Sequence, residues 1–383
     1  MKIFHIFFFL LIISFSSLAQ SDEDNLWISY MGDSIAASMF YEGAYIDTLF
    51  NRNIFLDKII IQKDDPNIKE FNDYFVHDLF GNFKIGSLLS TAIKKDDSYY
   101  DYLNHYVDVD GNIHILCRLF SPDGGVNYHD FQMSYIDIDS SYQIVDIYIY
   151  FSGEDLTETY RQVYKNLLRE KLEKITGVTN KTEAASSFNI LQKARQLKDE
   201  GKPEEGMALF YTIPKKYQEQ RHFRFWKVDL ALDLEDVNVY ANAMKEFEEA
   251  YPDDPSLFLL AIDKYTVLGD YQQALRYINK LDVKVGLDPI LNYYRGNINY
   301  EMNNVDQAIA DYEATREIAS FNELYINLFA LYHETNQDEK AIETLNHFLK
   351  DIDLEKRLIE EWVEEDYVDF TKKEIYLDWK KLK

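Results

Sequence analysis

The feature that most constrains this chain is a pattern that recurs about every 34 residues in its second half. Each copy contains a polar break, commonly with Gly or Asn, followed by a helical run with one small residue on its apolar face. The small residues lie 37, 31, 34 and 33 residues apart, at Gly206, Ala243, Ala274, Ala308 and Ala341. One turn further along each helix comes a large side chain: Phe210, Phe247, Ile278, Tyr312 and Leu345. The pattern predicts stacked helix pairs, because a small residue lets two helices approach closely.

The best-preserved copy reads YRGNINYEMNNVDQAIADY, residues 294–312. Its Gly296, Ala308 and Tyr312 fall at the glycine, alanine and aromatic positions of the tetratricopeptide repeat (TPR), a family that this half of the chain resembles. The resemblance covers about residues 186–351 and implies about five repeats, stacked into a superhelix with a concave groove. It also implies that a protein or peptide partner binds in the groove.

The geometry of the family assigns seven side chains to the groove: Asp263, Tyr293, Tyr294, Asn297, Tyr300, Asn327 and His333. Such a groove is aromatic, polar and acidic. Family members that capture the carboxyl terminus of a partner need Lys and Arg at these positions, which this sequence lacks, so carboxylate capture in the groove is not expected. Two interpretations of the tyrosines stay open: they contact a partner, or they pack against the next helix.

The first half of the chain has a different pattern. Trp27, Met31, Ile35 and Met39 recur every four residues and predict a helix. Further helical runs and then four extended runs follow, separated by turns such as the one at Gly111, and a helical run returns after Gly153. This order predicts an α+β domain with a four-stranded antiparallel meander. It resembles the NTF2-like class in the order of its elements alone.

These patterns divide the chain into five segments. We expect a signal peptide at 1–20, the α+β domain at 21–176, a linker at 177–187, the TPR-like repeats at 188–351 and capping helices at 352–383. The capping helices would give the end of the array a polar outer face. The expected fold class is therefore an α+β domain followed by an all-α helical solenoid.

The first twenty residues, MKIFHIFFFLLIISFSSLAQ, carry one basic residue, a short apolar run and a Ser-rich end. This composition is typical of a secretory signal peptide, with cleavage expected between Ala19 and Gln20. The chain would then be exported to the periplasm or the cell exterior, with no remaining membrane span. The net charge of −27 argues against a nucleic-acid partner. The single cysteine, Cys117, excludes an internal disulfide.

Few residues suggest chemistry. No pair of histidines has the spacing of metal ligands, and no Gly-rich phosphate loop follows a strand, so no metal or cofactor is expected. The Cys117 side chain falls in an apolar row and is expected in the core. On the predicted sheet, His129 could line a pocket or be a hydrogen-bonded structural residue, and Asp146 needs a partner if it is buried.

The sequence thus favours an exported, non-enzymatic interaction protein that binds a protein or peptide through the repeat groove. The alternative is a small-ligand or enzymatic pocket of the NTF2-like type near His129 and Asp146. A deep polar pocket on the concave face of the sheet would favour this alternative.

Overall fold

The computed structural model describes residues 22–61, 66, 68–81, 83–95, 98–121, 125–137, 141–176, 183–234, 236–252 and 254–382. The predicted signal peptide lies outside the described residues, as do residues 177–182 of the predicted linker. The helix that follows begins at Glu183, inside the segment that we expected to be a linker.

The first half combines short helices with one sheet. The helices are α1 (Asp22–Ser38), the short turn η1 (Met39–Tyr41), α2 (Ala44–Leu49), α3 (Arg52–Ile59), α4 (Lys69–Tyr74), the π-helical turn η2 (Phe75–Leu79), α5 (Ile85–Lys95) and α6 (Leu156–Thr176). The strands are β1 (Tyr99–Val107), β2 (Ile113–Phe120), β3 (Val126–Ile136), β4 (Ser141–Ile149) and β5 (Glu154–Asp155). They pair antiparallel in the order β1-β2-β3-β4-β5. The predicted meander is confirmed, and the two-residue β5 is an addition that was not predicted.

A β-bulge in β4 decides which side chains share a face of the sheet. Gln132 pairs with Asp146 and the next residue, Met133, pairs with Ile144, so Val145 is the extra residue. Such an insertion reverses the alternation of side chains along the strand. Ile144 and Ile147 therefore contribute to one core, while Asp146 lies on the other face.

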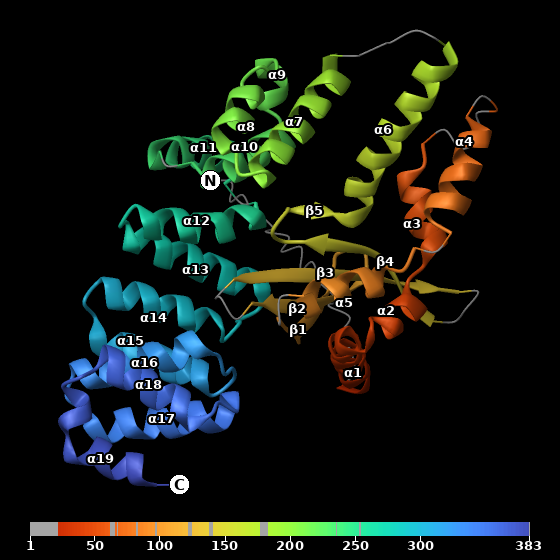
Figure 1. Cartoon of the computed structure of the whole chain (residues 1–383). Helices are drawn as coiled ribbons and strands as arrows, with labels where there is room; N and C mark the ends of the chain where they lie inside the picture. The colour runs from red at the N-terminus through yellow and green to blue at the C-terminus, as the bar shows by residue number, and fades with distance from the viewer. Residues whose placement is uncertain are drawn as a thin grey trace, which may run out of the picture.

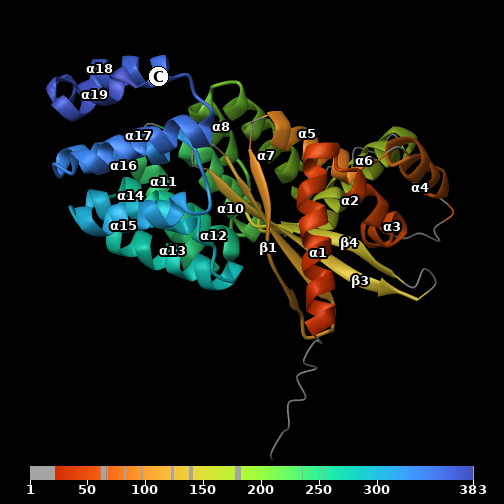
Figure 2. The same ribbon diagram turned by 90° about the horizontal axis from the view of Figure 1, so that it is seen from below.

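The first face of the sheet packs against α1, α2 and α5. Its core is built from strand residues including Ile115, Cys117 and Phe131, and from Ile28, Met31, Ile35 and Met39 of the first helical segment. Figure 2 shows α1 running across this face. The predicted stripe holds for Met31, Ile35 and Met39, but Trp27 is 47% exposed, and Ile28 is buried instead.

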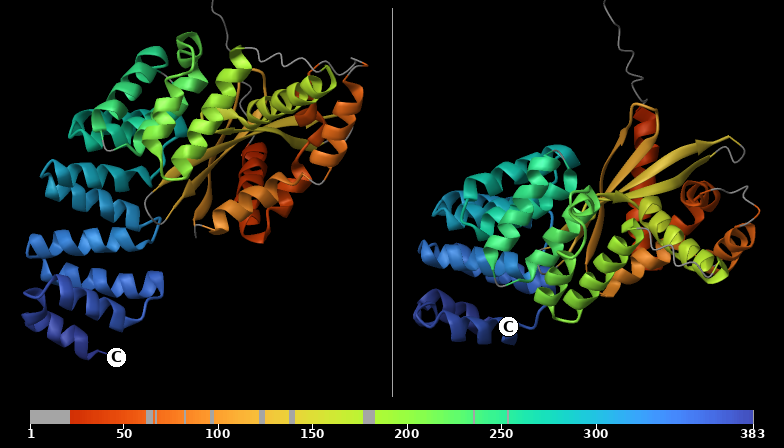
Figure 3. Two further views of the ribbon diagram at one scale, coloured as in Figure 1. Left: turned by 45° about the horizontal axis from the view of Figure 1, so that its top comes forward. Right: turned by 90° about the horizontal axis from the view of Figure 1, so that it is seen from above.

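The second half is a stack of helices along one side of the molecule (Figures 1 and 3). The helices are α7 (Glu183–Asp199), α8 (Pro203–Phe210), α9 (Lys215–Gln218), α10 (Arg221–Leu232), α11 (Val237–Ala250), α12 (Pro255–Val267), α13 (Tyr271–Val285), α14 (Leu291–Glu301), α15 (Val305–Arg316), α16 (Asn322–Glu334) and α17 (Asp338–Ile352). The chain ends with α18 (Lys356–Asp366), η3 (Phe370–Lys372) and α19 (Glu374–Lys381). The predicted order of an α+β part followed by an all-α array is confirmed.

The array consists of five helix pairs: α7 with α8, α10 with α11, α12 with α13, α14 with α15, and α16 with α17. Every small residue of the sequence repeat is buried on the second helix of its pair. The large residues one turn later are buried as well, at 0–2% exposure. The repeat therefore encodes the contact between the two helices of each pair.

The second face of the sheet packs against the helical array. Leu116, Phe120, Tyr128 and Tyr150 belong to the same apolar core as the array. The rings of Phe120 and Phe321 lie 4.8 Å apart, with Phe321 directly before α16. The array thus shares one core with the sheet, and α10, α12, α14 and α16 begin beside it.

A buried ion pair also joins the sheet to the array. Arg118 of β2 donates from Nη1 to Oδ1 of Asp288 at 2.5 Å, and the hydroxyl of Tyr128 donates to Oδ2 of Asp288 at 2.9 Å. Arg118 also donates to the exposed Asp101 at 2.6 Å. Burial alone would lower the pKa of Arg118, but Asp288 and Asp101 together raise it. The guanidinium therefore stays charged.

Gly296 provides a first test of this packing. A Cβ atom at this position would lie 2.5 Å from Cε1 of Tyr312, in the facing helix. We expect Gly296→Ala to destabilise the protein by about 1–3 kcal/mol, because the added methyl group has no room. Urea unfolding would measure the change. The cost should shrink when Tyr312 is first replaced by Leu, and an equal cost in both backgrounds would contradict the proposed clash.

Candidate functional site

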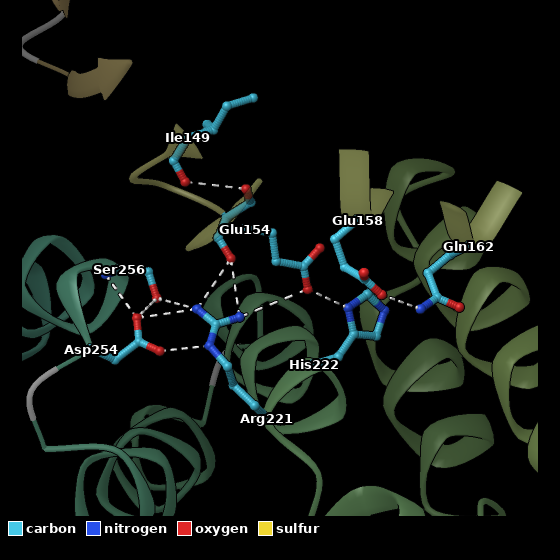
Figure 4. Close-up of polar contacts among 9 residues, drawn as sticks. Ile149, Glu154, Glu158, Gln162, Arg221, His222, Asp254 and Ser256 are labelled. Atoms are coloured by element: carbon cyan, nitrogen blue, oxygen red, sulfur yellow. Dashed lines mark hydrogen bonds and ion pairs between the residues drawn. The ribbon is translucent and has the colours of Figure 1, made fainter. Parts of the chain in front are cut away.

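The junction between the sheet and the array contains a polar network centred on Arg221, the first residue of α10 (Figure 4). Arg221 donates from Nε to Oδ2 of Asp254 at 2.6 Å and from Nη2 to Oδ1 at 3.1 Å. It also donates to Oγ of Ser256 and to the carbonyl oxygen of Ser152. Asp254 is the N-cap of α12 and accepts from the backbone N–H of Ser256. One side chain therefore links α10, α12 and the turn after β4.

The turn after β4 has a backbone that favours Gly at one position. Gly153 has φ +64°, in the left-handed region, and its N–H donates to the carbonyl oxygen of Ile149. A Cβ atom there would collide with Nη2 of Arg221. Glycine thus permits both the turn and the close approach of the guanidinium.

His222 follows Arg221 in α10 and contacts β5 and α7. Its Nδ1 is hydrogen-bonded to Oε1 of Glu154 at 2.8 Å, and its ring stacks on Phe188 of α7 with 5.4 Å between centroids. Nη1 of Arg221 lies 3.8 Å from the same oxygen of Glu154. Adjacent residues of α10 therefore both contact the short strand β5.

A cleft of about 420 Å³ opens beside His222, between α6 and the first helices of the array. This volume lies within the ~300–1,000 Å³ typical of ligand pockets. One wall is the polar face of α6, and the other is largely aromatic. The lining residues are Glu154, Glu158, Gln162, Lys165, Asn166, Arg169, Phe188, Tyr217, Gln220, His222 and Phe223.

A second pocket, of about 180 Å³, lies where the start of β3 meets α12 and α14. Its walls are mainly apolar, with one carboxyl group and one phenol ring: Gly125, Val126, Phe151, Leu259, Leu260, Ile262, Asp263, Leu291 and Tyr294. Protein atoms surround the carboxyl group of Asp263 on most sides, although the residue stays accessible to solvent. Desolvation raises the pKa of Asp263 to about 6. Within the described part of the chain, no donor or cation pairs with this carboxylate.

The pocket thus brings together two of the seven predicted groove residues, Asp263 and Tyr294. Three others take part in contacts within the array. Tyr293 is 7% exposed and packs edge-on against Phe321. Oδ1 of Asn297 accepts from the hydroxyl of Tyr312 at 2.7 Å, and Nδ2 of Asn327 lies 3.5 Å from that hydroxyl oxygen.

The last two predicted groove residues lie further along the array. His333 pairs with Asp369 at 3.3 Å and its ring packs against Tyr367 and Phe370, so it holds the terminal segment. Tyr300 is 46% exposed at the end of α14. Tyr300 therefore remains accessible to a partner, as do Asp263 and Tyr294 at their pocket.

The two candidates on the sheet lie on opposite faces. His129 is 5% exposed in the row of Cys117, and its Nδ1 is hydrogen-bonded to the hydroxyl of Tyr100 at 2.9 Å. Burial lowers the pKa of His129 to about 4 and raises that of the Cys117 thiol far above its usual range. Asp146 is 1% exposed on the other face because of the β-bulge. The geometry thus separates the two residues that the alternative interpretation placed at one pocket.

Asp146 has the partners that a buried carboxylate needs. It accepts from Nζ of Lys58 at 3.1 Å, from the backbone N–H of Thr157 at 3.1 Å and from the Thr157 hydroxyl at 2.5 Å. These contacts tie β4 to α3 and to the first turn of α6. In the structure, Asp146 therefore connects three elements of the α+β part.

Sequence reasoning did not find the junction residues. Arg221, His222 and Glu154 belong to no motif, and Glu154 lies 68 residues before His222. The stretch GEDLTE, residues 153–158, contains Glu154 and indicates by its pattern only the start of the helical run after Gly153. No periodic signal marks contacts between segments so far apart, so only the tertiary structure identifies this site.

Two kinds of feature were not found among the described residues. In that part of the chain, no group of three or more His, Cys, Asp or Glu side chains is placed to hold a metal ion. None of the helices described there combines the length and the apolar character that crossing a membrane requires.

Comparison with known proteins gave matches among solved structures. No protein-family model and no curated protein matches this chain. A thermophilic TPR protein of Thermus thermophilus is 18% identical, with a TM-score of 0.34 over 46% of this chain and 97% of that protein. A tetratricopeptide repeat protein of Parabacteroides merdae is 14% identical, with a TM-score of 0.30 over 54% of this chain and 93% of that protein.

Proposed function

We propose that this protein is a non-enzymatic binding protein that holds a protein partner against its helical array. Stacked helix pairs form an extended surface to which every pair contributes side chains. A surface of this kind suits the recognition of a protein. Here the array shares a core with the sheet, so its binding surface is held in one orientation. Such preorganisation lowers the entropic cost of binding.

The pocket between β3, α12 and α14 is the observation that carries this proposal. Its volume of about 180 Å³ resembles that of apolar cavities of ~150 Å³ that accept a benzene-sized group. The pocket can therefore take one side chain of a partner. Tyr294 at its wall provides aromatic contact area.

Asp263 defines the side chain that the pocket would accept. A lysine or arginine has an apolar stem that suits the Leu259, Leu260 and Ile262 walls and a cationic end that can reach the unpaired carboxylate. The ionised carboxylate binds this cation, so binding should strengthen as the pH rises through about 6. We therefore propose a partner segment with an exposed basic side chain.

Binding to short peptides with amidated carboxyl termini would test the proposal. We expect peptides with a central Lys or Arg to bind, and replacement of that residue by Met to weaken binding at least tenfold. Lowering the pH from 7 to 5 should weaken binding roughly tenfold, because about nine-tenths of Asp263 is then protonated.

Variants locate the site. Asp263→Asn should bind weakly at both pH values, and Tyr294→Ala should also bind weakly. Val283→Ala, at a 76% exposed position of α13, should behave like the wild type. If Asp263→Asn and Tyr294→Ala bind like the wild type, or if no basic peptide binds, the pocket is not the partner site.

We also propose that the protein works outside the cytoplasm. The composition of residues 1–20 supports this proposal. Mass measurement of the protein from an exporting host should give a mature chain that starts at Gln20, and retention of Met1 would contradict it.

A further inference from the structure

The cleft beside His222 has a distribution of charge that the proposed function does not use. Its acidic residues are neutralised from within the protein. Glu154 is hydrogen-bonded to His222 and lies near Arg221. Glu158 accepts from Nη1 of Arg161 at 2.7 Å and from Nε2 of Gln162 at 2.7 Å. These carboxylates therefore do not need a cationic ligand.

The basic residues of the cleft have no such partners in the part of the chain that the structure describes. Lys165 and Arg169 lie one turn apart on the same face of α6, and both line the cleft. Arg169 donates to the side-chain oxygen of Asn189 at 3.1 Å, its one hydrogen bond among the residues described around it. Lys165 has no hydrogen bond or ion pair with any described residue. Among the described residues, no carboxylate balances either cation, although the protein as a whole has a net charge of −27.

Two amide side chains complete the polar lining. Neither Asn166 of α6 nor Gln220, just before α10, has a side-chain partner in the described part of the chain. Each amide can donate and accept a hydrogen bond, as the backbone of an extended peptide requires. The opposite wall presents the rings of Phe188, Tyr217 and Phe223, which can pack against apolar side chains.

We propose that this cleft binds the free carboxyl terminus of a peptide or protein. Lys165 and Arg169 bind the terminal carboxylate, because an unneutralised pair of cations favours an anion and Arg can donate two parallel hydrogen bonds to it. Asn166 and Gln220 pair with the peptide backbone, and the aromatic wall packs against the last side chains. The volume of about 420 Å³ suits a few terminal residues rather than a folded domain.

This site is separate from the pocket at Asp263 and does not depend on the proposed function. The two sites have opposite preferences, since one presents an unpaired carboxylate and the other two unpaired cations. A partner segment with a basic side chain is therefore expected at the Asp263 pocket, and a chain end with its free carboxylate is expected in the cleft. The seven predicted groove positions of the array carry no Lys or Arg, whereas the lining of the cleft includes both.

The test uses the whole protein and one set of short peptides, prepared with either a free or an amidated carboxyl terminus. We expect peptides with apolar last residues and a free terminus to bind at least tenfold more tightly than their amidated forms. The Lys165→Gln/Arg169→Gln double variant should lose this preference. Its fold should be unchanged in circular dichroism, because the side chain of Lys165 is exposed and that of Arg169 only partly buried.

A matched control removes one Arg and one Lys elsewhere. Arg276→Gln/Lys284→Gln on α13 changes the net charge by the same amount and should keep the preference for the free terminus. The Tyr294→Ala variant should keep it too, which separates this site from the partner pocket. Equal binding of free and amidated peptides, or an equal loss in the control variant, would overturn the proposal. Binding of inorganic phosphate without any binding of free-carboxyl peptides would also overturn it, in favour of a phosphate site.

Discussion

Asp288→Ala is expected to destabilise the protein by about 3–5 kcal/mol, because it leaves Arg118 charged and buried without its main partner. The carboxylate side chain is fully buried, and it accepts hydrogen bonds from both Arg118 and Tyr128. Its removal also weakens the contact between the sheet and the array, since Arg118 and Tyr128 come from strands and Asp288 from the loop before α14. Urea unfolding would measure the loss.

Two further variants make this prediction specific. Asp101 contacts the same guanidinium at 2.6 Å, but its side chain is 51% exposed, so Asp101→Ala should cost less than about 1 kcal/mol. Replacing both charges, as Arg118→Met with Asp288→Leu, should recover much of the stability lost in Asp288→Ala, because no unpaired charge remains. A loss below about 1 kcal/mol in Asp288→Ala would contradict the buried pair that joins the sheet to the array.

His129 should make a separable contribution to the pH dependence of stability. Its pKa is about 4 in the folded protein, against about 6.5 in an unfolded chain. Between pH 6.5 and 4 the unfolded state therefore binds a proton that the folded state does not, and stability falls as the pH falls through this window. The difference in pKa corresponds to a loss of about 3 kcal/mol by pH 4, and the loss is absent above pH 7.

His129→Gln should remove this acid sensitivity, because Gln keeps a polar group near Tyr100 but has no titrating nitrogen. Unfolding free energies of the two proteins, compared at pH 7.5 and at pH 4.5, should converge as the pH falls. His114 contributes with the opposite sign, since Asp130 and Asp108 raise its pKa despite burial, and so does Asp263, whose pKa burial raises to about 6. Both groups are unchanged in the two proteins and cancel in the comparison. If the unfolding free energies of wild type and variant differ by the same amount at both pH values, the neutral, buried state of His129 is contradicted.

Much of the architecture could be predicted from the sequence, because the signals were local. Helices with a 34-residue repeat place Gly206, Ala243, Ala274, Ala308 and Ala341 at close contacts whatever surrounds them, and all five are buried. Turn residues such as Gly111 likewise define hairpins through their own backbone preference. The β-bulge at Val145 could not be predicted in this way. One additional residue leaves no pattern in a strand of nine residues, yet it moves Asp146 to the opposite face.

The sites were determined by contacts between distant segments. The sequence alone identified an array of helix pairs after an α+β part, since periodicity depends on neighbours only a few residues apart. Whether a predicted groove residue is buried or lines a pocket depended on how the helices of the array pack on one another and on the sheet. Asp288 meets Arg118 across 170 residues, and Arg221 meets Asp254 across 33. Residues so far apart in the sequence come into contact only when the whole chain has folded. The tertiary structure therefore decided that Tyr293 is buried, that Asp263 lines a pocket and that Lys165 faces a cleft.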